Sequence, residues 1–570
     1  MRSKSTSLCL ALLVAVTASA CVAPSRPASE SRLAAAERPS TQPKRVVAAI
    51  WGNANTVVNK LNVANYIAGI DAMQFLTVAF LARTDPAGLP VAQLAERVPS
   101  LENGLWELFP DGSMETTWKI RSDARWHDGV PITAKDLAFT ATVAQDPELQ
   151  ILRETNLRRV SQVDVVDPQT LKVRWREPFI DADKTFPGVL PPLPQHVLEP
   201  AYEANKATFA ELPYWSTDYV GAGPFKVKEF VLGSRVTFVA NDQYVLGRPK
   251  VDEVEVQFIP DANTLGANLL SGSVELTLGR AFAFDQAAQI GDQWSAGRIL
   301  TAESFAYSLF AQMIDPQPEI LGNVQFRRAL YYGLDRQPMI DALQPGTTTV
   351  PTTFMPPNRP EYRDVEAGIT GYPYDPRRAA QLIEGLGYQK GGDGFYRDGT
   401  NQEPQVPILS SPEDAQWKLA QITGAQWQTL GVRSNPMAYP PQRASDREYI
   451  NTRPGYLLRG GWRDTSNFLW FPSSEVPLAS NGYLGLNVSR YGTPELDALI
   501  SSFETTIPLA QRNQVAGQML RLFMDELPML LLFFRVEPTM VSNRISGVEP
   551  GSGSVFTTAN TAHLWDVVRS

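Results

Sequence analysis

The chain has 570 residues, a formal net charge of −9 and two cysteines, and 43% of its residues are apolar. A chain of this length can bury a large core and is typical of three or four domains. Because the charge is mildly acidic and no cluster of Lys or Arg is present, the composition argues against nucleic acid as a partner.

The sequence also lacks the motifs of the common enzyme classes. His127, His196 and His563 are too far apart in the sequence for metal-ligand spacing. No nucleophile, phosphate-binding or metalloprotease motif occurs in its required context. We therefore expect a protein that is not an enzyme, with no catalytic residues, no metal-binding residues and no cofactor.

The N-terminus has the pattern of a secretory signal peptide. Arg2 and Lys4 precede an apolar run over residues 8–18, which is too short to span a bilayer. Small residues then lead to Cys21, in a pattern that resembles the bacterial lipobox, where the signal is removed and the Cys thiol receives a lipid. We predict a signal peptide over residues 1–20 and lipidation of Cys21. Because Ala18 stands where the lipobox usually has Leu, ordinary cleavage and release of a soluble chain is the alternative.

Residues 21–44 are rich in Ala, Pro, Ser and charged residues and have no apolar period. Such a segment buries too little surface to fold, so we expect a flexible tether behind the lipidated Cys21. Removal of the signal peptide also removes Cys9, which leaves no second cysteine for an intrachain disulfide. No later segment approaches 18 consecutive apolar residues.

The next part of the chain alternates strand and helix signals. Predicted strands and hairpins cover residues 45–51, 118–126, 163–175, 225–240 and 254–259. Predicted helices cover a stretch that ends near Leu81, a segment that begins after Thr133, and residues 262–271. Thr133 and Asp136 have the spacing of a capping box, and Asp167 with Pro168 predicts the turn of the second hairpin.

The C-terminal part has longer helical segments. Predicted helices cover residues 326–343, 376–386, 493–503 and 509–524, and a buried strand is expected over 528–534. We expect ion pairs at helix ends from Arg327, Arg328, Asp335 and Arg336. The mixture of strands and long helices indicates an α/β or α+β protein with a mixed sheet.

Six segments in chain order carry a resemblance to a known family. They are Trp106 to Thr140 (with W-K-I-R and W-H-D-G-V-P-I-T-A-K-D), 220–225 (VGAGPF), 241–254, 272–275, 326–336 (FRRALYYGLDR) and 374–388. Together they resemble bacterial extracellular solute-binding protein family 5, the peptide- and nickel-type binding proteins of ABC importers. Most of these motifs have structural explanations as turns, caps and helix ends, and we assign His127 to structure on that ground.

The resemblance implies an α/β, two-lobe periplasmic-binding-protein-like fold of the large, three-domain type II variety, with mixed sheets and an interlobe ligand cleft. It implies a first lobe over residues 45–90, 216–300 and 526–570, an extra domain over 91–215, and a second lobe over 301–525.

The resemblance also suggests where a ligand binds. In the family's peptide binders, an Arg-x-x-Trp followed shortly by Asp lies in the second lobe, where the Trp lines the cleft and the Asp pairs with the peptide amino terminus. Arg459 and Trp462 match that spacing, whereas Asp464 follows after only two residues and the loop is shorter. The alternative is a strand and turn with buried aromatic residues and a surface ion pair. Weaker candidates, for which core packing is the alternative, are Trp51, Asn53, Phe282, Phe284, Tyr307, Gln312 and Tyr439.

The leading hypothesis is a monomeric, lipid-anchored protein at the outer face of the cytoplasmic membrane or in the periplasm. It would capture a short peptide or peptide-like solute and deliver it to an ABC permease and ATPase complex. The same fold could instead bind an oligosaccharide, a metal chelate or an opine-like compound, or could report ligand occupancy to a sensor. A secreted hydrolase with a carboxylate pair is the alternative from the enzyme class.

Overall fold

The computed structural model describes residues 42–61, 69–85, 89–149, 152, 154–183, 190–356, 362–366, 368–462, 465–551 and 558–568. The predicted signal peptide, Cys21 and nearly all of the predicted tether lie outside the described residues. The chain divides into two compact units, 1–42 and 43–570, and the fold below is that of the second. None of the helices in the described ranges is both long and apolar enough to cross a membrane.

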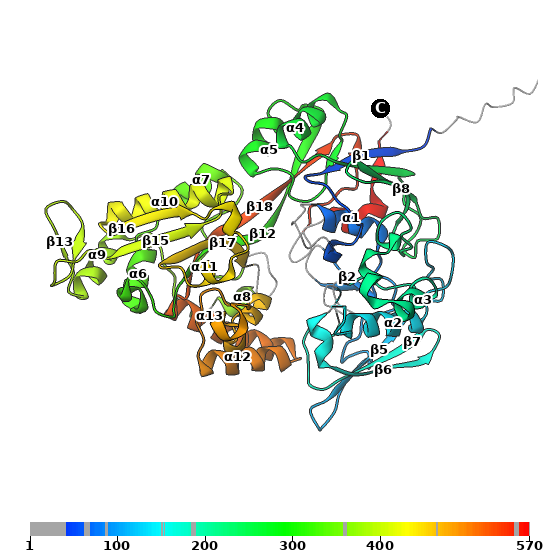
Figure 1. Ribbon diagram of the computed structural model, residues 1–570, viewed down its shortest axis with the longest axis horizontal. Coiled ribbons are helices and arrows are strands. Elements are labelled where there is room, and N and C mark those ends of the chain that lie inside the picture. Colours follow the sequence, from blue (N-terminus) through cyan, green and yellow to red (C-terminus); the bar gives the residue numbers. More distant parts are fainter. Residues whose placement is uncertain are drawn as a thin grey trace, which may run out of the picture. The chain divides into compact units, whose positions relative to one another are not determined.

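A ten-stranded mixed sheet organises this unit, in the order β16-β15-β17-β12-β18-β11-β1-β10-β9-β8 (Figure 1). In one half, β1 (Arg45–Ile50) pairs in parallel with β10 (Glu253–Phe258) and β11 (Leu276–Thr277). Two antiparallel strands, β9 (Arg235–Ala240) and β8 (Phe225–Val231), complete this edge. Because β1 lies inside the sheet and is nearly all apolar, it is the buried strand that the sequence predicts.

The other half of the sheet contains β15 (Gln405–Ser410), β16 (Arg433–Ala438) and β17 (Tyr456–Trp462). Helix α10 (Asp414–Leu430) joins β15 to β16 and packs on both. The ring of Trp427 in α10 lies 5.4 Å from that of Tyr456, and its indole N–H donates to the carbonyl of Leu330. Burial of this large side chain fixes the helix on one face of the sheet half.

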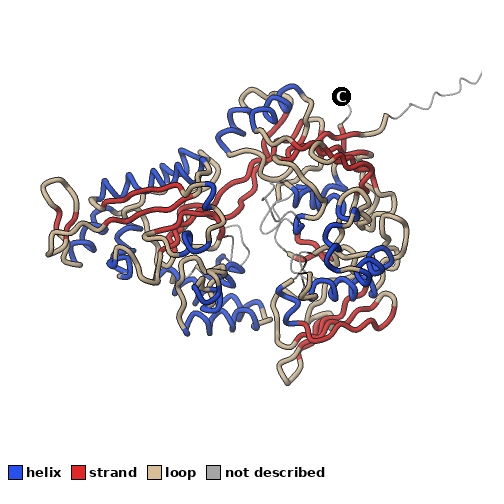
Figure 2. Tube along the Cα trace, viewed as in Figure 1, coloured by secondary structure: helices blue, strands red, loops and turns tan. Residues whose placement is uncertain are grey.

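Two long strands connect the halves: β12 (Gly297–Ala311) and β18 (Met529–Ser542) (Figure 2). They pair with each other along almost their whole lengths. β17 pairs with β12 only from Ala306 onward, and β11 pairs with β18 only at Val541. Between these points the sheet narrows to a two-stranded ribbon, and its register shifts between Glu303 and Ala306. Two-stranded ribbons twist strongly and bulges bend them, so this is where the fold can flex.

A smaller sheet, β4-β5-β7-β6, lies in the predicted extra domain. Its strands are β4 (Trp106–Leu108), β5 (Met114–Lys119), β7 (Thr170–Trp175) and β6 (Val160–Asp167), and α2 (Ala134–Gln145) packs on it. The predicted hairpin and its turn are confirmed, as is the capping box of Thr133 and Asp136. The strand expected over 118–126 was wrong: β5 ends at Lys119, because the polar residues that follow form a turn closed by Ala124 N–H on Arg121 O.

The remaining elements complete the unit. The helices are α1 (Ile70–Thr77), α3 (Gln195–Ala204), α4 (Ala262–Ser271), α5 (Phe284–Gly291), α8 (Tyr362–Val365), α9 (Pro376–Gly385), α11 (Arg447–Asn451), α12 (Pro494–Thr505) and α13 (Leu509–Glu526). The short strands are β2 (Ala82–Thr84), β3 (Pro90–Ala92), β13 (Gln389–Lys390), β14 (Tyr396–Arg397), β19 (Ile545–Ser546) and β20 (Asp566–Val567). The predicted helices over 262–271, 376–386, 493–503 and 509–524 are confirmed within two residues at each end, while the first helix ends at Thr77 rather than near Leu81.

The single helix expected over 326–343 was wrong. The structure has two helices there, α6 (Val324–Tyr332) and α7 (Gln337–Leu343). Pro338 stands in the first turn of α7, where it lacks the N–H that a continuous helix requires.

The ion pairs expected at the ends of these helices are replaced mainly by bonds to the backbone. Arg336 is buried, and its guanidinium donates to the carbonyls of Pro351, Leu531 and Tyr372. Arg327 donates to the carbonyls of Leu321, Gly322 and Glu526.

The buried His127 is hydrogen-bonded to the segment at Gly221–Gly223, and these bonds depend on its protonation state. Its Nδ1 accepts from the N–H of Gly221, so Nε2 carries the proton and donates to Gly223 O at 3.1 Å. Burial lowers the pKa of His127 to about 3, although the Gly223 bond works in the opposite direction. The structural role predicted for this histidine fits these contacts.

We expect His127 to destabilise the fold in acid. Because its folded pKa lies below the unfolded value, the unfolded state binds the proton first, and stability falls as pH drops below about 6.5. The loss from this one group reaches about 2–3 kcal/mol at a pH of roughly 4.5. Denaturant unfolding at neutral and acidic pH should show a smaller pH dependence in His127→Gln than in the unaltered chain. Equal pH dependence in both proteins would contradict this assignment.

Candidate functional site

The carboxyl ends of the parallel strands β10, β1 and β11 meet at one edge of the sheet, which is where ligands commonly bind in such folds. Trp51 directly follows β1, and 45% of its surface is exposed even though the strand before it is buried. Gly52, with φ of 137°, turns the chain here, and Asn53 is also exposed. A large aromatic side chain and an amide are thus presented to solvent at this edge.

Arg459 is presented from the other half of the sheet. It lies in the middle of β17, directly opposite Ser308 of β12. The residue is exposed, although burial of its guanidinium lowers the pKa of Arg459. Among the described residues, its hydrogen bond is from Nε to Gly460 O at 3.3 Å. Within the described ranges no carboxylate pairs with this guanidinium, and the buried Ser308 hydroxyl also lacks a hydrogen-bond partner. The guanidinium of Arg459 is therefore the charged group that this strand offers to a ligand, while the buried Ser308 hydroxyl lies beneath the surface.

Two glycines after Arg459 allow aromatic rings to lie directly on β17. A Cβ on Gly460 would come within 1.9 Å of the Phe305 ring, and one on Gly461 within 2.9 Å of the Trp470 ring. Glycine in a strand often marks such a close approach. Phe305 belongs to the bulge in β12 and packs on Tyr307, on the face of the sheet to which Gly460 points. Because successive side chains of a strand alternate, Arg459 points to the other face, so Trp470 at Gly461 is the aromatic neighbour that can share its face.

Charged groups at the ribbon are balanced among themselves. Arg535 in β18 lies 3.2 Å from Glu537 and 3.4 Å from Glu413, and Arg280 lies 4.0 Å from Glu537. Burial raises the pKa of Glu537, against the effect of the two guanidinium groups. Arg280 and Arg535 also contact the Phe305 ring, 5.6 and 5.5 Å from its centroid. Because the two guanidinium groups are balanced by two carboxylates, this cluster needs no charged ligand to neutralise it.

Three predicted site residues lie in the core. Phe282 belongs to a small apolar cluster with Trp294. Tyr307 is 2% exposed and packs against Phe305 and Phe533. Gln312 is buried, and its amide donates to Asn451 O at 2.7 Å. These environments favour core packing, the alternative reading of each residue.

Of the other predicted site residues, two have described side chains and two do not. Phe284 begins α5 and is partly exposed, and Tyr439 follows β16, half-buried and electrostatically coupled to Arg459. The side chain of Trp462 and the whole of Asp464 lie outside the described residues. Phe305 and Ser308 were missed. Gly460 was the one signal for the Phe305 ring, and nothing local indicated Ser308.

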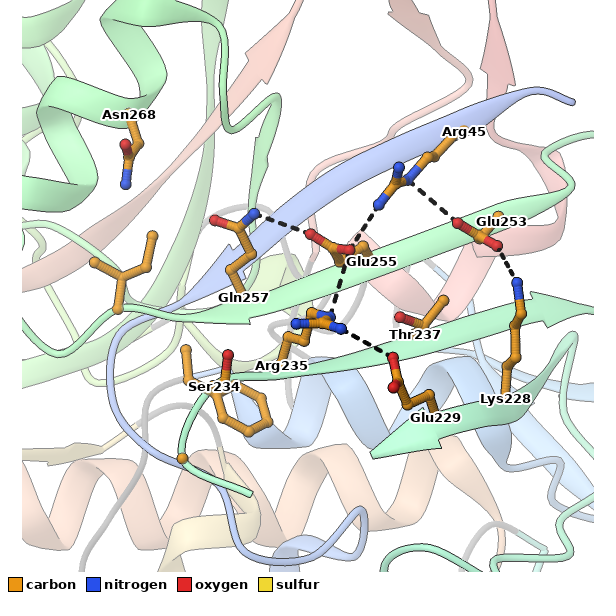
Figure 3. Close-up of a pocket in the computed structure, with 13 residues that line it drawn as sticks. Arg45, Lys228, Glu229, Ser234, Arg235, Thr237, Glu253, Glu255, Gln257 and Asn268 are labelled. Atoms are coloured by element: carbon orange, nitrogen blue, oxygen red, sulfur yellow. Dashed lines mark hydrogen bonds and ion pairs between the residues drawn. The ribbon is translucent and has the colours of Figure 1, made fainter. Parts of the chain in front are cut away.

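A surface hollow of about 550 Å³ lies elsewhere, over β8, β9 and β10 (Figure 3). Arg45 bridges Glu253 and Glu255 at 3.2 and 2.6 Å, and Arg235 pairs with Glu229 at 3.0 Å. None of the predicted site residues that the structure describes lines this hollow. Because the charged side chains in this hollow pair with one another across neighbouring strands, we interpret it as a network of surface ion pairs and not as the candidate site.

The arrangement described here offers binding groups rather than a reactive centre. Among the residues with described positions, no group of three His, Cys, Asp or Glu side chains is placed to hold a metal ion. Aromatic surface near Arg459 and Trp51 can supply contact area, and a guanidinium can orient a carboxylate.

Comparison with known proteins places these features in context. Residues 92–476, more than half of the chain, match the family model for bacterial extracellular solute-binding proteins, family 5, middle region. The chain is 24% identical over 468 residues to heme-binding protein A of Haemophilus influenzae, covering 78% of this chain and 80% of that protein. It is 24% identical over 508 residues to the oligopeptide-binding protein OppA of Bacillus subtilis, covering 84% and 85%.

Among solved structures, NikZ from Campylobacter jejuni in complex with Ni(L-His) matches with a TM-score of 0.71 and 20% identity. The match covers 92% of this chain and all of that one. At this identity the likeness is one of fold, and it shows the two-lobe α/β architecture that the sequence analysis anticipated.

Proposed function

The chain belongs to the bacterial extracellular solute-binding proteins of family 5, and from this premise we propose that it captures a short peptide or peptide-like solute between its lobes. Proteins of this family are substrate-binding proteins of ABC transporters, not enzymes. The finer assignment to a peptide is our own. It is supported by the similarity to an oligopeptide-binding protein over 84% of the chain.

The narrow β12–β18 ribbon is the observation that carries the proposal. The ribbon contains a bulge. It is two strands wide between Val541, where β11 pairs with β18, and Ala306, where β17 begins to pair with β12. Bending there changes the spacing of the halves without disrupting either core. A ligand can contact both Trp51 and Arg459 only when the two lobes are closed on it. Because these interactions stabilise the closed state and not the open state, binding drives closure.

The chemistry around Arg459 suits the end of a peptide. Its guanidinium, which no carboxylate in the described ranges pairs with, can bind a carboxylate in a bidentate geometry. Trp470, whose ring lies on Gly461, adds apolar contact area that does not depend on the side-chain sequence of the peptide. Such a site favours peptides as a class over one particular peptide.

We further propose that the protein is exported, anchored through a lipid on Cys21, and works as a monomer that delivers its solute to a permease and ATPase complex. The apolar run over 8–18 and the small residues before Cys21 support export and anchoring. Domain limits at 45–90, 91–215, 216–300, 301–525 and 526–570 remain part of the proposal. Incorporation of labelled fatty acid that is lost in Cys21→Ala tests the anchor alone.

A thermal-shift screen tests the cargo. Protein lacking residues 1–21 is mixed with pools of di- to hexapeptides, and at least one pool should raise the melting temperature. A ligand at about 100 times its dissociation constant stabilises by about 2.7 kcal/mol, which is readily detected. If no peptide pool shifts the transition while other solutes do, the peptide assignment fails.

A second cargo class has a specific observation in its favour. Among the described residues, Arg459 has no carboxylate partner, and an anionic solute, including a metal chelate, would supply one. Two proteins similar to this one are named for heme binding or were solved with Ni(L-His). Adding chelates such as Ni(L-His) to the same thermal-shift screen separates this class from peptides.

A further inference from the structure

Helix α12 contacts the predicted extra domain directly, away from the β12–β18 ribbon. Glu504, near the C-terminus of α12, contacts Arg159 and Ile180, which flank the β6–β7 hairpin. Helix α12 lies between β17 and β18 in the chain, whereas Arg159 and Ile180 lie between β1 and β8, two strands of the first sheet half. The contact therefore connects regions that the ribbon would separate on bending.

The guanidinium of Arg159 is held in place by its own domain. Its Nη1 donates to Glu177 Oε1 at 3.0 Å, and its Cζ lies 5.0 Å from the centroid of the Phe179 ring. The remaining Nη2 donates to Glu504 Oε1 at 2.5 Å. Because the domain already orients this side chain, little conformational entropy is lost when Glu504 arrives.

The bridge is also shielded from solvent. The exposed fractions of the Arg159 and Glu504 side chains are 23% and 18%. Partial burial weakens screening by salt, so such a pair contributes more than a fully exposed one.

A backbone bond accompanies the ion pair. The N–H of Ile180 donates to Glu504 O at 3.1 Å. This carbonyl is one of those that a helix C-terminus leaves without an intrahelical donor. One residue of α12 thus meets the extra domain through both its side chain and its main chain.

Glu504 is poorly placed for the stability of α12 alone. A carboxylate near a helix C-terminus is disfavoured by the helix dipole, and the last turn of α12 has no basic residue to offset it. Arg159 from the other region supplies the missing cation. The acidic residue at this position is therefore explained by the contact and not by the helix.

We propose that the Arg159–Glu504 pair, together with the Ile180–Glu504 backbone bond, is a latch that holds the two lobes together around a bound solute and slows its release. The role in release rests on the proposed function. The latch itself requires only that the contact form and break as the ribbon bends.

Amide hydrogen exchange at Ile180 reports the latch directly, because this N–H is one of its bonds. In the mature exported protein without added solute, Glu504→Gln should raise exchange at Ile180 by about tenfold, the effect of losing one charge-assisted bond. Glu495→Gln, which removes an exposed carboxylate from the first turn of the same helix, is the matched control and should leave this exchange unchanged. Equal exchange in the two variants would overturn the latch.

Release is measured with a defined pool of tri- to pentapeptides. Glu504→Gln should speed dissociation of the bound peptides by about threefold to tenfold relative to Glu495→Gln. Faster exchange with unchanged dissociation would overturn the role in release. If the unaltered protein binds no peptide of the pool, the peptide assignment fails, and the exchange result alone decides whether the latch exists.

Discussion

Replacing Arg459 by alanine is expected to weaken solute binding by about 100-fold, or about 2.7 kcal/mol. The guanidinium has no carboxylate partner within the described part of the chain, so a ligand anion bound there loses its main counter-charge in the variant. Titration calorimetry with a solute identified in the screen measures the effect. The unfolding transition should hardly change, since Arg459 is an exposed residue and, among the described residues, donates to Gly460 O alone.

Arg443→Ala is the matched control for Arg459. Arg443 belongs to the same sheet half, pairs with Asp446 at 2.7 Å and packs on the Tyr449 ring. Its removal should leave affinity within about twofold, because it is outside the candidate site and exposed pairs contribute little. Equal affinities for the two variants would remove Arg459 from the site.

The second large effect is expected on stability. Gly223→Ala should lower the free energy of unfolding by about 3–5 kcal/mol. An added Cβ would lie 2.3 Å from Thr77 C and 2.4 Å from Val78 N, both of which are backbone atoms that cannot move aside locally. The same glycine donates its N–H to Thr77 O, so any shift breaks this bond as well.

Gly385→Ala serves as the control for Gly223. It ends α9, has an ordinary φ, and has no atom within 4 Å of an added Cβ. Alanine there should be neutral or slightly stabilising, because it reduces the freedom of the unfolded chain. Denaturant unfolding of both variants provides the comparison, and a Gly223→Ala protein as stable as the unaltered chain would refute the close contact.

Local chemistry made much of the fold predictable. The capping box at Thr133 and the hairpin turn at Pro168 depend on neighbours within a few residues, and both are confirmed. The full length of β18 was not predictable in the same way. Glu537 and Pro538 interrupt its apolar run, and they are in a strand because β12 pairs with them across the ribbon.

The candidate site was less predictable because residue type does not reveal long-range partners. Gln312 directly follows β12, and Arg459 lies in the neighbouring strand β17. The amide of Gln312 donates to the carbonyl of Asn451, which lies far along the chain, whereas Arg459 has no carboxylate partner among the described residues. The Phe305 ring lies over β17 because Gly460, which pairs with Tyr307, has no side chain, a relation that neither segment shows by itself.

Native mass spectrometry of the protein purified from its own host without added ligand shows whether it carries a solute. We expect a population heavier than the bare chain by the mass of one small solute. This population should be lost on denaturation and should be smaller in Arg459→Ala than in Arg443→Ala. A bare chain under all mild conditions, together with turnover of a peptide or glycan added to it, would contradict the claim that this protein captures a solute without transforming it.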